Sequence, residues 1–498
     1  MSDATIIEPR VPRGFRDYLP SQMNARLRLI EAIRKVYELY GFQPLDTPAQ
    51  EFRETLEGYG EEGSKQIFRF RNPEEEDVAL RFDLTAPLAR VVAGHPDLPL
   101  PFRRYQVAAV WRADKPDAGR FREFLQFDMD SVGTSSPAAD TEILCCVYDT
   151  LRALGLERFQ VRFSSRKVLN VLLDFAGIPR GAAHGVFRVL DKLEKIGLQA
   201  VKEELTAGRT DASGDRIRGL GLERSQVERV ERFLSLPGGS RREALRQAAG
   251  LLSSVPAAEE ALGGLEQIIA GLERLAIPER QVRVDLSIAR GLDYYTGTVF
   301  EAFLEDASDY GAVFGGGRYD TLVRRFLGRD LPAVGASLGV DRLLAALQTL
   351  GLMESRPATA RVLVTVMDGS RMGAYEVLAR ELREAGFNTE MYLGQEGGLG
   401  KQLQYANRLG IPVAVIMGSD EFERGQATVK NLRLGALLQE GKKPAAARER
   451  EEWLRLSRSV QVTVPRGELI AQIRAMLADP SASGGRGTAA VPSTGATP

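Results

Sequence analysis

Residues 282–304 have the sequence VRVDLSIARGLDYYTGTVFEAFL, in which two strand-forming segments flank a short polar turn. The flanking segments are rich in β-branched and aromatic residues, a composition that favours extended strands. In the turn, Arg290 supplies a permanent cation and Asp293 an acceptor. Tyr294 and Tyr295 add two hydroxyl groups on aromatic rings. The stretch therefore predicts a sheet that holds a small polar ligand where its strands are joined.

Further strand signals lie upstream, and a helical stretch separates them from this segment. The short segments IFRF, VALRFDL and FREFLQFDMDSV predict antiparallel strands. From about residue 168 to residue 280, Leu, Ala, Glu, Lys and Arg recur at helical periods, which predicts a helical insertion. We expect the two β-rich blocks around this insertion to form one sheet. Ahead of them we expect a helix from Ser21 to Gly41, with a buried stripe of Leu27, Ile30, Ile33 and Tyr37.

The order of elements changes after Met353. Strand patterns in RVLVTVM, TEMYL and VAVIMG alternate with two helical patterns, which predicts a small α/β domain over residues 360–465. Residues 480–498 contain mainly Gly, Ser, Thr, Pro and Ala, so we expect a disordered tail. The predicted fold class is therefore α+β, with an antiparallel sheet core and its helical insertion within residues 1–355.

Composition bounds the class of protein. The chain has 498 residues, of which 44% are hydrophobic and 27% charged, as in ordinary globular proteins of two or three domains. Its formal net charge is −1, so a nucleic-acid surface would require local clusters of Lys and Arg. The N-terminus lacks a signal-peptide pattern, and no apolar run approaches the about 20 residues that span a bilayer. We therefore expect a soluble protein.

The few cysteines and histidines argue against redox and metal sites. Cys145 and Cys146 are adjacent, which excludes an ordinary loop-closing disulfide between them and indicates the reducing cytoplasm. His95 and His184 lie far apart in the sequence, without partners at ligand spacing. Neither a histidine metal site nor a His-containing catalytic triad is predicted.

Two segments place polar side chains at regular spacing in predicted strands. In RFDLTAPLAR, Asp83 and Thr85 share one face of an extended strand, with a solvated strand edge as the alternative. In FREFLQFDMD, alternation places Gln126, Asp128 and Asp130 on one face. A buried sheet face tolerates such a concentration of polar groups only when they contact a ligand or each other, and solvent exposure is the alternative.

Arginines and glycines mark the remaining candidate segments. A loop between two predicted strands carries Arg112, Arg120 and Arg122. In GAVFGGGRYD, the glycines at 315–317 either allow close approach of the backbone to a ligand or simply form a turn. The Walker spacing of a P-loop is absent. Arg342 lies at the start of a predicted helix. Its side chain either contacts a ligand or is a charge on the helix surface.

Together these segments resemble class II aminoacyl-tRNA synthetases, and among them the histidyl-tRNA synthetase family. The resemblance begins with PRGFRDYLP at Pro12 and continues through RFDLTAPLAR, the arginine loop, ARGLDYYTGTVFE, GGGRYD and GVDRLL. FRVLDKLEKI is similar to the family's helical insertion, and QLQYANRLGIPVAVIMGSDEFERGQATVKNL to its C-terminal anticodon-binding domain. It covers nearly all of residues 10–435 in the same order.

The resemblance implies ATP-dependent ligation of L-histidine to histidine tRNA through a histidyl-adenylate intermediate, with Mg²⁺ as cofactor. Such a reaction needs no protein nucleophile, but it needs cations that neutralise charge on the phosphates. By resemblance, Arg112 and Arg290 bind the α-phosphate from opposite sides, and Arg342 binds the terminal phosphates. Arg120 is expected to contact ATP as well. The Mg²⁺ ligands are not assigned, and a cytoplasmic homodimer without membrane attachment is implied.

The resemblance also implies a divided site for histidine. The ammonium group requires acceptors, and the imidazole requires one donor and one acceptor. Glycines would let a strand lie flat against the bound histidine and adenylate. By resemblance, the residues at the ammonium group are Asp83, Thr85 and Gln126. Those at the imidazole are Asp130, Tyr294 and Tyr295. The glycines of the flat strand are Gly315 and Gly317.

Three other readings of the chain stay open beside this resemblance. A catalytically silent paralogue, such as a regulatory subunit of histidine biosynthesis, would generally lack the C-terminal domain and the RGLDYY segment, and this chain has both. A synthetase for proline, threonine or glycine would share the core but not the segment 289–301. A pure RNA-binding module would not need three arginines positioned at an acidic amino-acid site.

Three positions depart from the pattern of relatives. Ala113 and Asp117 replace residues that are often basic or polar, so recognition of the tRNA acceptor end, including any extra 5′ guanylate, stays open. Ser337 replaces a glycine that is frequent in class II chains, a small-for-small change that we expect to matter little.

Overall fold

The structure is a computed structural model in which two compact units are formed by residues 1–16 with 29–350, and by residues 17–28 with 351–498. The described residues are 7–57, 64–116, 120–211, 214–289, 291, 294–353, 355, 357–394, 398–435 and 460–478. Arg290, Asp293, Asp117 and the predicted tail 480–498 therefore lie outside the described residues.

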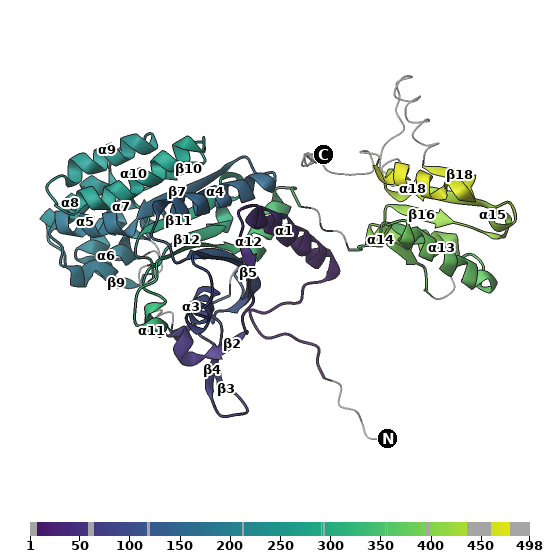
Figure 1. Cartoon of the computed structure of the whole chain (residues 1–498), viewed down its shortest axis with the longest axis horizontal. Helices are drawn as coiled ribbons and strands as arrows, with labels where there is room; N and C mark the ends of the chain where they lie inside the picture. Colours follow the sequence, from purple (N-terminus) through teal and green to yellow (C-terminus); the bar gives the residue numbers. More distant parts are fainter. Residues whose placement is uncertain are drawn as a thin grey trace. The chain divides into compact units, whose positions relative to one another are not determined.

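An eight-stranded sheet forms the centre of the first unit (Figure 1). Its strand order is β1-β5-β6-β13-β12-β11-β7-β10, and neighbouring strands are antiparallel except at the two edges, where β1 pairs with β5 and β10 with β7 in parallel. The strands are β1 (Gln43–Pro44), β5 (Phe102–Trp111), β6 (Glu123–Val132), β7 (Phe159–Ser165), β10 (Val282–Val284), β11 (Thr298–Leu304), β12 (Phe314–Arg318) and β13 (Ala333–Gly339). Strands from both sides of the helical stretch thus share one sheet, as the sequence predicts.

The helical insertion predicted between the two β-rich blocks is confirmed. Its helices gather at one end of the sheet, with a two-stranded hairpin among them (Figure 1). Helix α10 packs against both α5 and α4, which ties the insertion to the sheet layer. The elements are α5 (Arg166–Ala176), η2 (Arg180–Ala182), α6 (Ala183–Leu190), α7 (Leu193–Leu205), β8 (Gly208–Thr210), β9 (Arg216–Arg218), α8 (Arg224–Leu234), α9 (Arg241–Leu252) and α10 (Ala258–Arg274).

Helix α1 (Pro20–Leu39) forms where the sequence predicts it, but its buried stripe differs from the prediction. Ile33 and Tyr37 are fully buried, whereas Leu27 is 53% exposed. Leu29 is buried instead. The predicted stripe was therefore wrong at its N-terminal end. Leu27 and Leu29 are two positions apart and point to different sides of the helix, and the side that carries Leu29 is the buried one.

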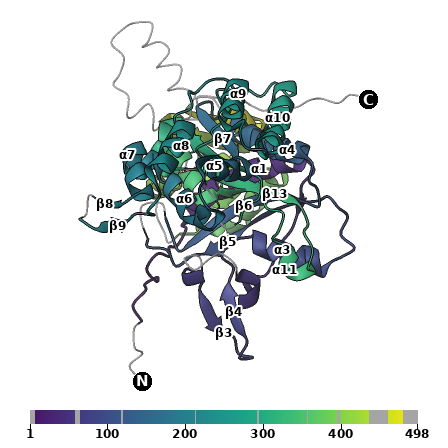
Figure 2. The same ribbon diagram turned by 90° about the vertical axis from the view of Figure 1, so that its left-hand side faces the viewer.

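The remaining elements of the first unit surround the sheet. A small three-stranded sheet, β2-β4-β3, projects from the body of this unit (Figure 2). Helix α4 packs against β13 and β7, and α12 follows β13 directly. These elements are β2 (Gln50–Phe52), η1 (Arg53–Leu56), β3 (Arg69–Arg71), β4 (Asp77–Leu80), α3 (Thr85–Gly94), α4 (Pro137–Ala153), η3 (Glu305–Tyr310), α11 (Arg324–Leu327) and α12 (Val340–Thr349).

The C-terminal unit is an α/β sheet with its own core, as predicted. Its strand order is β15-β14-β16-β17-β18, with the first three strands parallel and the last two antiparallel. A core cluster between this sheet and its helices includes Val364, Tyr375 and Val415. The elements are β14 (Val362–Val364), η4 (Gly369–Arg371), α13 (Met372–Glu384), β15 (Thr389–Met391), α14 (Leu399–Leu409), β16 (Val413–Ile416), α15 (Ser419–Glu423), β17 (Gln426–Asn431), β18 (Gln461–Pro465), η5 (Arg466–Glu468) and α18 (Leu469–Ala478).

Within the described residues, no helix combines the length and the apolar content that a membrane crossing requires.

Candidate active site

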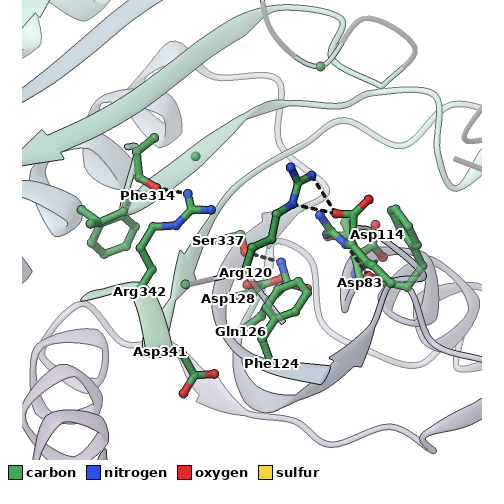
Figure 3. A pocket seen from close by; sticks show the side chains of 18 of the residues that line it. Asp83, Asp114, Arg120, Phe124, Gln126, Asp128, Phe314, Ser337, Asp341 and Arg342 are labelled. Carbon is green, nitrogen blue, oxygen red and sulfur yellow. Dashed lines mark hydrogen bonds and ion pairs between the residues drawn. The ribbon is translucent and has the colours of Figure 1, made fainter. Parts of the chain in front are cut away.

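A cavity of about 450 Å³ lies over strands β6, β12 and β13 of the first unit. It brings together most of the residues that the sequence singles out. Figure 3 draws side chains that line this cavity and labels ten of them. Cations and carboxylates share its wall with aromatic rings. These groups are Arg112, Arg120 and Arg342; Asp83, Asp114, Asp128 and Asp341; and Phe82, Phe121, Phe124, Phe314, Tyr294 and Tyr295.

Asp83 and Thr85 both line the cavity, but the local structure differs from the predicted strand. Strand β4 ends at Leu80, and helix α3 begins at Thr85. Asp83 Oδ1 accepts hydrogen bonds from the backbone N–H groups of Thr85 at 3.0 Å and Ala86 at 3.1 Å. The prediction that the two residues share a strand face was therefore wrong, because the Asp83 side chain satisfies the first N–H groups of a helix.

The guanidinium group of Arg112 is held against two aromatic rings. Arg112 Nε donates to the Phe82 carbonyl at 3.1 Å. The guanidinium carbon lies 4.3 Å from the centroid of the Phe82 ring and 5.3 Å from that of Phe124. These contacts orient a permanent cation at the cavity wall without pairing it to a carboxylate among the described residues.

Arg120 and Arg342 hold two further guanidinium groups at the cavity. Arg120 donates to Asp114 Oδ2 from Nε at 3.0 Å and from Nη2 at 2.7 Å. Arg342 Nη1 donates to the Ala312 carbonyl at 2.6 Å. Figure 3 shows Gln126 and Ser337 drawn between Arg342 on one side and the Arg120–Asp114 pair on the other.

The floor of the cavity is formed by polar side chains on adjacent strands. Gln126 and Asp128 project from β6, and Ser337 of β13 lies in register opposite Asp128. Gln126 Nε2 donates to Ser337 Oγ at 2.6 Å. Asp128 is only 1% exposed, and burial raises its pKa to about 7. The alternative of a solvent-exposed face is thus excluded for these residues.

Asp130 lies deeper than the cavity wall and already has partners. Its Oδ2 forms an ion pair with Arg104 Nη2 at 2.7 Å, and its Oδ1 accepts a hydrogen bond from the Tyr319 hydroxyl. Asp130 is not among the residues that line the cavity, so the structure does not bring it to the ligand surface where the sequence expects it. Its carboxylate instead holds a buried network behind the floor.

The two predicted tyrosines form an aromatic wall at the cavity. The Tyr294 and Tyr295 rings lie 5.1 Å apart in an edge arrangement, and Tyr294 lies 5.2 Å from the ring of Tyr319. Gly315 lines the cavity, but Gly317 does not. A Cβ atom at Gly317 would lie 2.8 Å from the Tyr295 ring and 2.4 Å from a backbone oxygen, so this glycine lets Tyr295 pack against β12.

Arg290 and Asp293, the two charged residues singled out in the turn, lie outside the described residues. Gly291 and Tyr294, which are adjacent to them in the sequence, both line the cavity. The turn between β10 and β11 therefore reaches this site.

Several cavity residues were not assigned from the sequence. Asp114 and Asp341 bring carboxylates that were not foreseen, and Asp341 Oδ2 accepts from the Leu125 N–H at 2.9 Å. The alternation of polar residues in FREFLQFDMD pointed to Asp128, but the family resemblance did not assign it a role. Ser337, expected to matter little, is a hydrogen-bonded member of the floor.

Replacing Asp130 with alanine is expected to destabilise the protein by about 3–5 kcal/mol, because Arg104 would remain as a buried charge without its partner. Arg104 is 0% exposed and Asp130 3% exposed. Thermal and chemical unfolding of Asp130→Ala would measure the loss. As a matched control, Asp330→Ala removes a carboxylate from an exposed pair with Arg324 and should change stability by less than about 1 kcal/mol. Equal stability of the two variants would contradict the structural role.

The arrangement suits an amino acid joined to a nucleotide. Three guanidinium groups can neutralise phosphate oxygens, while buried carboxyl and amide oxygens on the floor can accept from an ammonium group. An antiparallel sheet with such a site, a helical insertion and a C-terminal α/β unit defines a class II aminoacyl-tRNA synthetase. Within this class, the family model described as histidyl-tRNA synthetase matches residues 14–343, and that of the anticodon binding domain matches residues 361–476. The chain belongs to the histidyl-tRNA synthetase family.

Relatives resemble the chain over nearly its whole length. A histidine–tRNA ligase of Ruegeria sp. (strain TM1040) is 42% identical over 493 residues, covering 94% of this chain and 96% of the relative. The crystal structure of histidyl-tRNA synthetase from Nostoc sp. PCC 7120 has a TM-score of 0.77 and 32% identity, over 94% of this chain and 100% of that one. A Bacillus halodurans structure described as an ATP phosphoribosyltransferase regulatory subunit/histidyl-tRNA synthetase has a TM-score of 0.67 and 25% identity, over 80% of this chain and 97% of that one.

Proposed function

We propose that the cavity over β6, β12 and β13 is the site at which this enzyme joins histidine to ATP and then to tRNA. The reaction is the ATP-dependent ligation of L-histidine to histidine tRNA. In the first step the histidine carboxylate attacks the α-phosphate, and pyrophosphate leaves. In the second step a terminal ribose hydroxyl of the tRNA attacks the histidyl carbonyl, and AMP leaves. The observation that carries this assignment is the pairing of three arginines with a buried acceptor floor in one cavity.

The arginines are assigned to different phosphates of ATP. Arg112 binds the α-phosphate, where charge develops in the first step, and its aromatic contacts fix its orientation before ATP arrives. Arg342 binds the terminal phosphates from the start of α12. Arg120 exchanges its Asp114 partner for ATP, and Arg290 completes the site from the turn after β10. Each of these contacts is charge-assisted and suits phosphate oxygens.

The histidine end uses the floor and the tyrosine wall. Thr85 and Gln126 face the ammonium group, with Asp83 fixing the turn that carries Thr85. Tyr294 and Tyr295 face the imidazole, and Gly315 lets β12 lie close to the ligand. We assign Asp130 a supporting role through Tyr319, because its carboxylate is already engaged there.

Asp114 and Asp341 are the residues that would hold Mg²⁺ when it accompanies ATP in this cavity. In the described part of the chain there is no group of three or more Asp, Glu, His or Cys side chains that would hold a metal ion by itself. The single carboxylates at the cavity, Asp114 and Asp341, fit Mg²⁺ in this role, because it takes one or two carboxylates together with phosphates and water. When bound, it neutralises charge on the departing pyrophosphate.

The test of the proposed function is ATP–pyrophosphate exchange with each of the twenty amino acids. Exchange should depend on histidine alone, and tRNA charging should use histidine tRNA. Exchange driven by proline, threonine or glycine would contradict the assignment. A protein that binds neither histidine nor ATP would support the silent regulatory paralogue, which the match to an anticodon-binding domain at residues 361–476 disfavours.

Arg290→Ala is expected to reduce adenylate formation by roughly 10²–10³-fold, because it removes a cation facing the developing charge. Histidine binding should fall less than the rate. Histidine-dependent exchange and equilibrium binding would separate the two effects. A near-normal exchange rate in a folded variant would remove Arg290 from the site.

Domain limits, assembly and location complete the proposal. The catalytic core occupies residues 1–355 and the anticodon-binding domain about residues 360–465. The enzyme is a cytoplasmic homodimer, as class II cores pair near their first motif. Leu39, the last residue of α1, is an apolar side chain that is 85% exposed in the single chain. Light scattering on the purified protein tests the dimer.

A further inference from the structure

The turn between β10 and β11 begins at Asp285, which fixes its first residues to the sheet. Asp285 Oδ1 accepts hydrogen bonds from the Ser287 N–H at 3.1 Å and from the Ser287 hydroxyl at 2.6 Å. The Asp285 N–H donates to the Phe163 carbonyl of β7 at 2.9 Å. Ala289, four residues further on, is 1% exposed. The first part of the turn, residues 285–289, is therefore packed in place, and its position depends on Asp285.

The same turn continues into the active-site cavity. Gly291 lines that cavity, and its carbonyl accepts hydrogen bonds from the N–H groups of Tyr294 at 3.1 Å and Tyr295 at 3.0 Å. Both tyrosine rings form the aromatic wall of the cavity. A displacement of residues 285–289 would therefore be passed along a short stretch of chain to this wall.

Arg162 of β7 contacts two carboxylates that come from different parts of the first unit. Its Nη1 forms an ion pair with Glu194 Oε1, in the first turn of α7, and lies 3.8 Å from Asp285 Oδ2. Its Nε donates to Gln160 Oε1 at 3.4 Å, and its guanidinium carbon lies 5.0 Å from the centroid of the Phe303 ring. One guanidinium nitrogen thus joins the helical insertion to the start of the turn.

The space between the insertion and the turn is small and acidic. A cavity of about 50 Å³ separates the junction of α6 and α7 from residues 285–289, and Glu301, which lies opposite Arg162 in the register of β11 and β7, also lines it. Among the described lining residues, Arg162 is the one with a positive charge. The carboxylates that line the cavity are Asp191, Glu194, Asp285 and Glu301. Without the guanidinium group, these like charges would repel one another across the gap.

We propose that Arg162 is a positioning residue for adenylate formation, which pairs with Glu194 and Asp285 together and so holds the start of the turn against the helical insertion. This assignment rests on the proposed function, because the turn matters through the cavity wall that it carries. Arg162 is absent from the described lining of the active-site cavity, so it acts through Asp285 and not on the substrates. A misplacement of about 1 Å at an active site can cost roughly 10²-fold in rate.

Burial indicates which of the three charged groups matters most. The Glu194 side chain is 65% exposed, whereas those of Arg162 and Asp285 are each 19% exposed. Loss of Glu194 removes a solvated ion pair and leaves Arg162 with Asp285, which is a small change. Loss of Arg162 leaves Glu194 and Asp285 facing each other without a cation. Removal of the Glu194 charge should then relieve part of that repulsion.

Histidine-dependent ATP–pyrophosphate exchange by single and double variants tests this order. Glu194→Gln should lower kcat by about 2–5-fold and Arg162→Gln by about tenfold or more, with the KM for ATP unchanged. The double variant should be more active than Arg162→Gln alone, although Glu194→Gln is harmful by itself. Arg162→Lys retains a cation at the gap and should recover part of the lost kcat.

Two further variants serve as controls for these changes. Glu203→Gln alters a carboxylate near the other end of α7, where it accepts from Gln199 of the same helix at 3.1 Å, and should leave exchange unchanged. Glu194→Lys reverses the charge at an exposed position, so it should fold even if Arg162→Gln does not. Because it places a second cation beside Arg162, its kcat should fall further than that of Glu194→Gln.

Three results would overturn the proposal. The first is a normal kcat in Arg162→Gln or in Glu194→Lys. The second is a lower melting temperature with unchanged kcat per folded molecule, which would make Arg162 purely structural. The third is a double variant no more active than Arg162→Gln, which would show that Glu194 and Asp285 do not share this cation. Failure of the proposed function is distinct, since the wild-type protein itself would then show no histidine-dependent exchange.

Discussion

Arg112→Ala is expected to lower histidine-dependent ATP–pyrophosphate exchange by roughly 10²–10³-fold, the loss typical of removing one donor that stabilises charge in a transition state. The guanidinium group is already oriented by the Phe82 carbonyl at 3.1 Å and by the Phe82 and Phe124 rings. No reorganisation is needed when negative charge develops on the α-phosphate. The loss should therefore appear in kcat more than in the KM for histidine.

Two further variants define this effect. Arg112→Lys retains the charge but not the planar fork, so its activity should lie between that of wild type and that of Arg112→Ala. Arg324→Ala removes an arginine from an exposed pair with Asp330 and should leave exchange unchanged. Near-normal exchange by a folded Arg112→Ala protein would show that Arg112 does not contact the reacting phosphate.

Removal of the C-terminal unit after about residue 355 is expected to preserve histidine-dependent exchange but reduce tRNA charging by roughly 10²-fold or more. A loss of this size corresponds to two or three contacts of about 1 kcal/mol each. The C-terminal unit has its own core clusters, built within residues 358–477, whereas every described residue of the cavity precedes the cut. The decrease should lie mainly in the KM for tRNA, and it should grow with salt concentration because phosphate contacts are screened.

The truncated protein must first be shown to be folded and of unchanged oligomeric state. Exchange activity close to that of the full chain shows that the cavity is intact, and light scattering shows whether the oligomeric state is unchanged. If the truncated enzyme charges histidine tRNA as well as the full chain does, the C-terminal unit has been misinterpreted. If exchange is lost together with charging, the two units depend on each other for folding.

Periodicity and composition predicted most of the architecture. The segment TVFEAFL forms β11 at Thr298–Leu304, and the second of the two helical patterns predicted after Met353 forms α14 (Leu399–Leu409). These predictions succeed because alternation and the helical repeat report which side of an element is buried. The predicted buried stripe of α1 was wrong at Leu27, since a short apolar pattern does not reveal which neighbour covers it. The predicted strand at Thr85 was wrong because the pattern does not reveal that a capping side chain begins a helix there.

The sequence by itself determined the fold class, the two β-rich blocks around a helical insertion, and most residues of the cavity, because local pattern and motif order carry that information. Only the tertiary structure decided how the carboxyl groups of β6 divide their tasks. Asp128 and Asp130 have the same side chain and the same parity in the strand. Arg104 and Tyr319 reach Asp130 from distant segments and engage it, while Asp128 faces the cavity beside Ser337. The pKa and the partner of a buried charge depend on such long-range neighbours, which strand alternation does not encode.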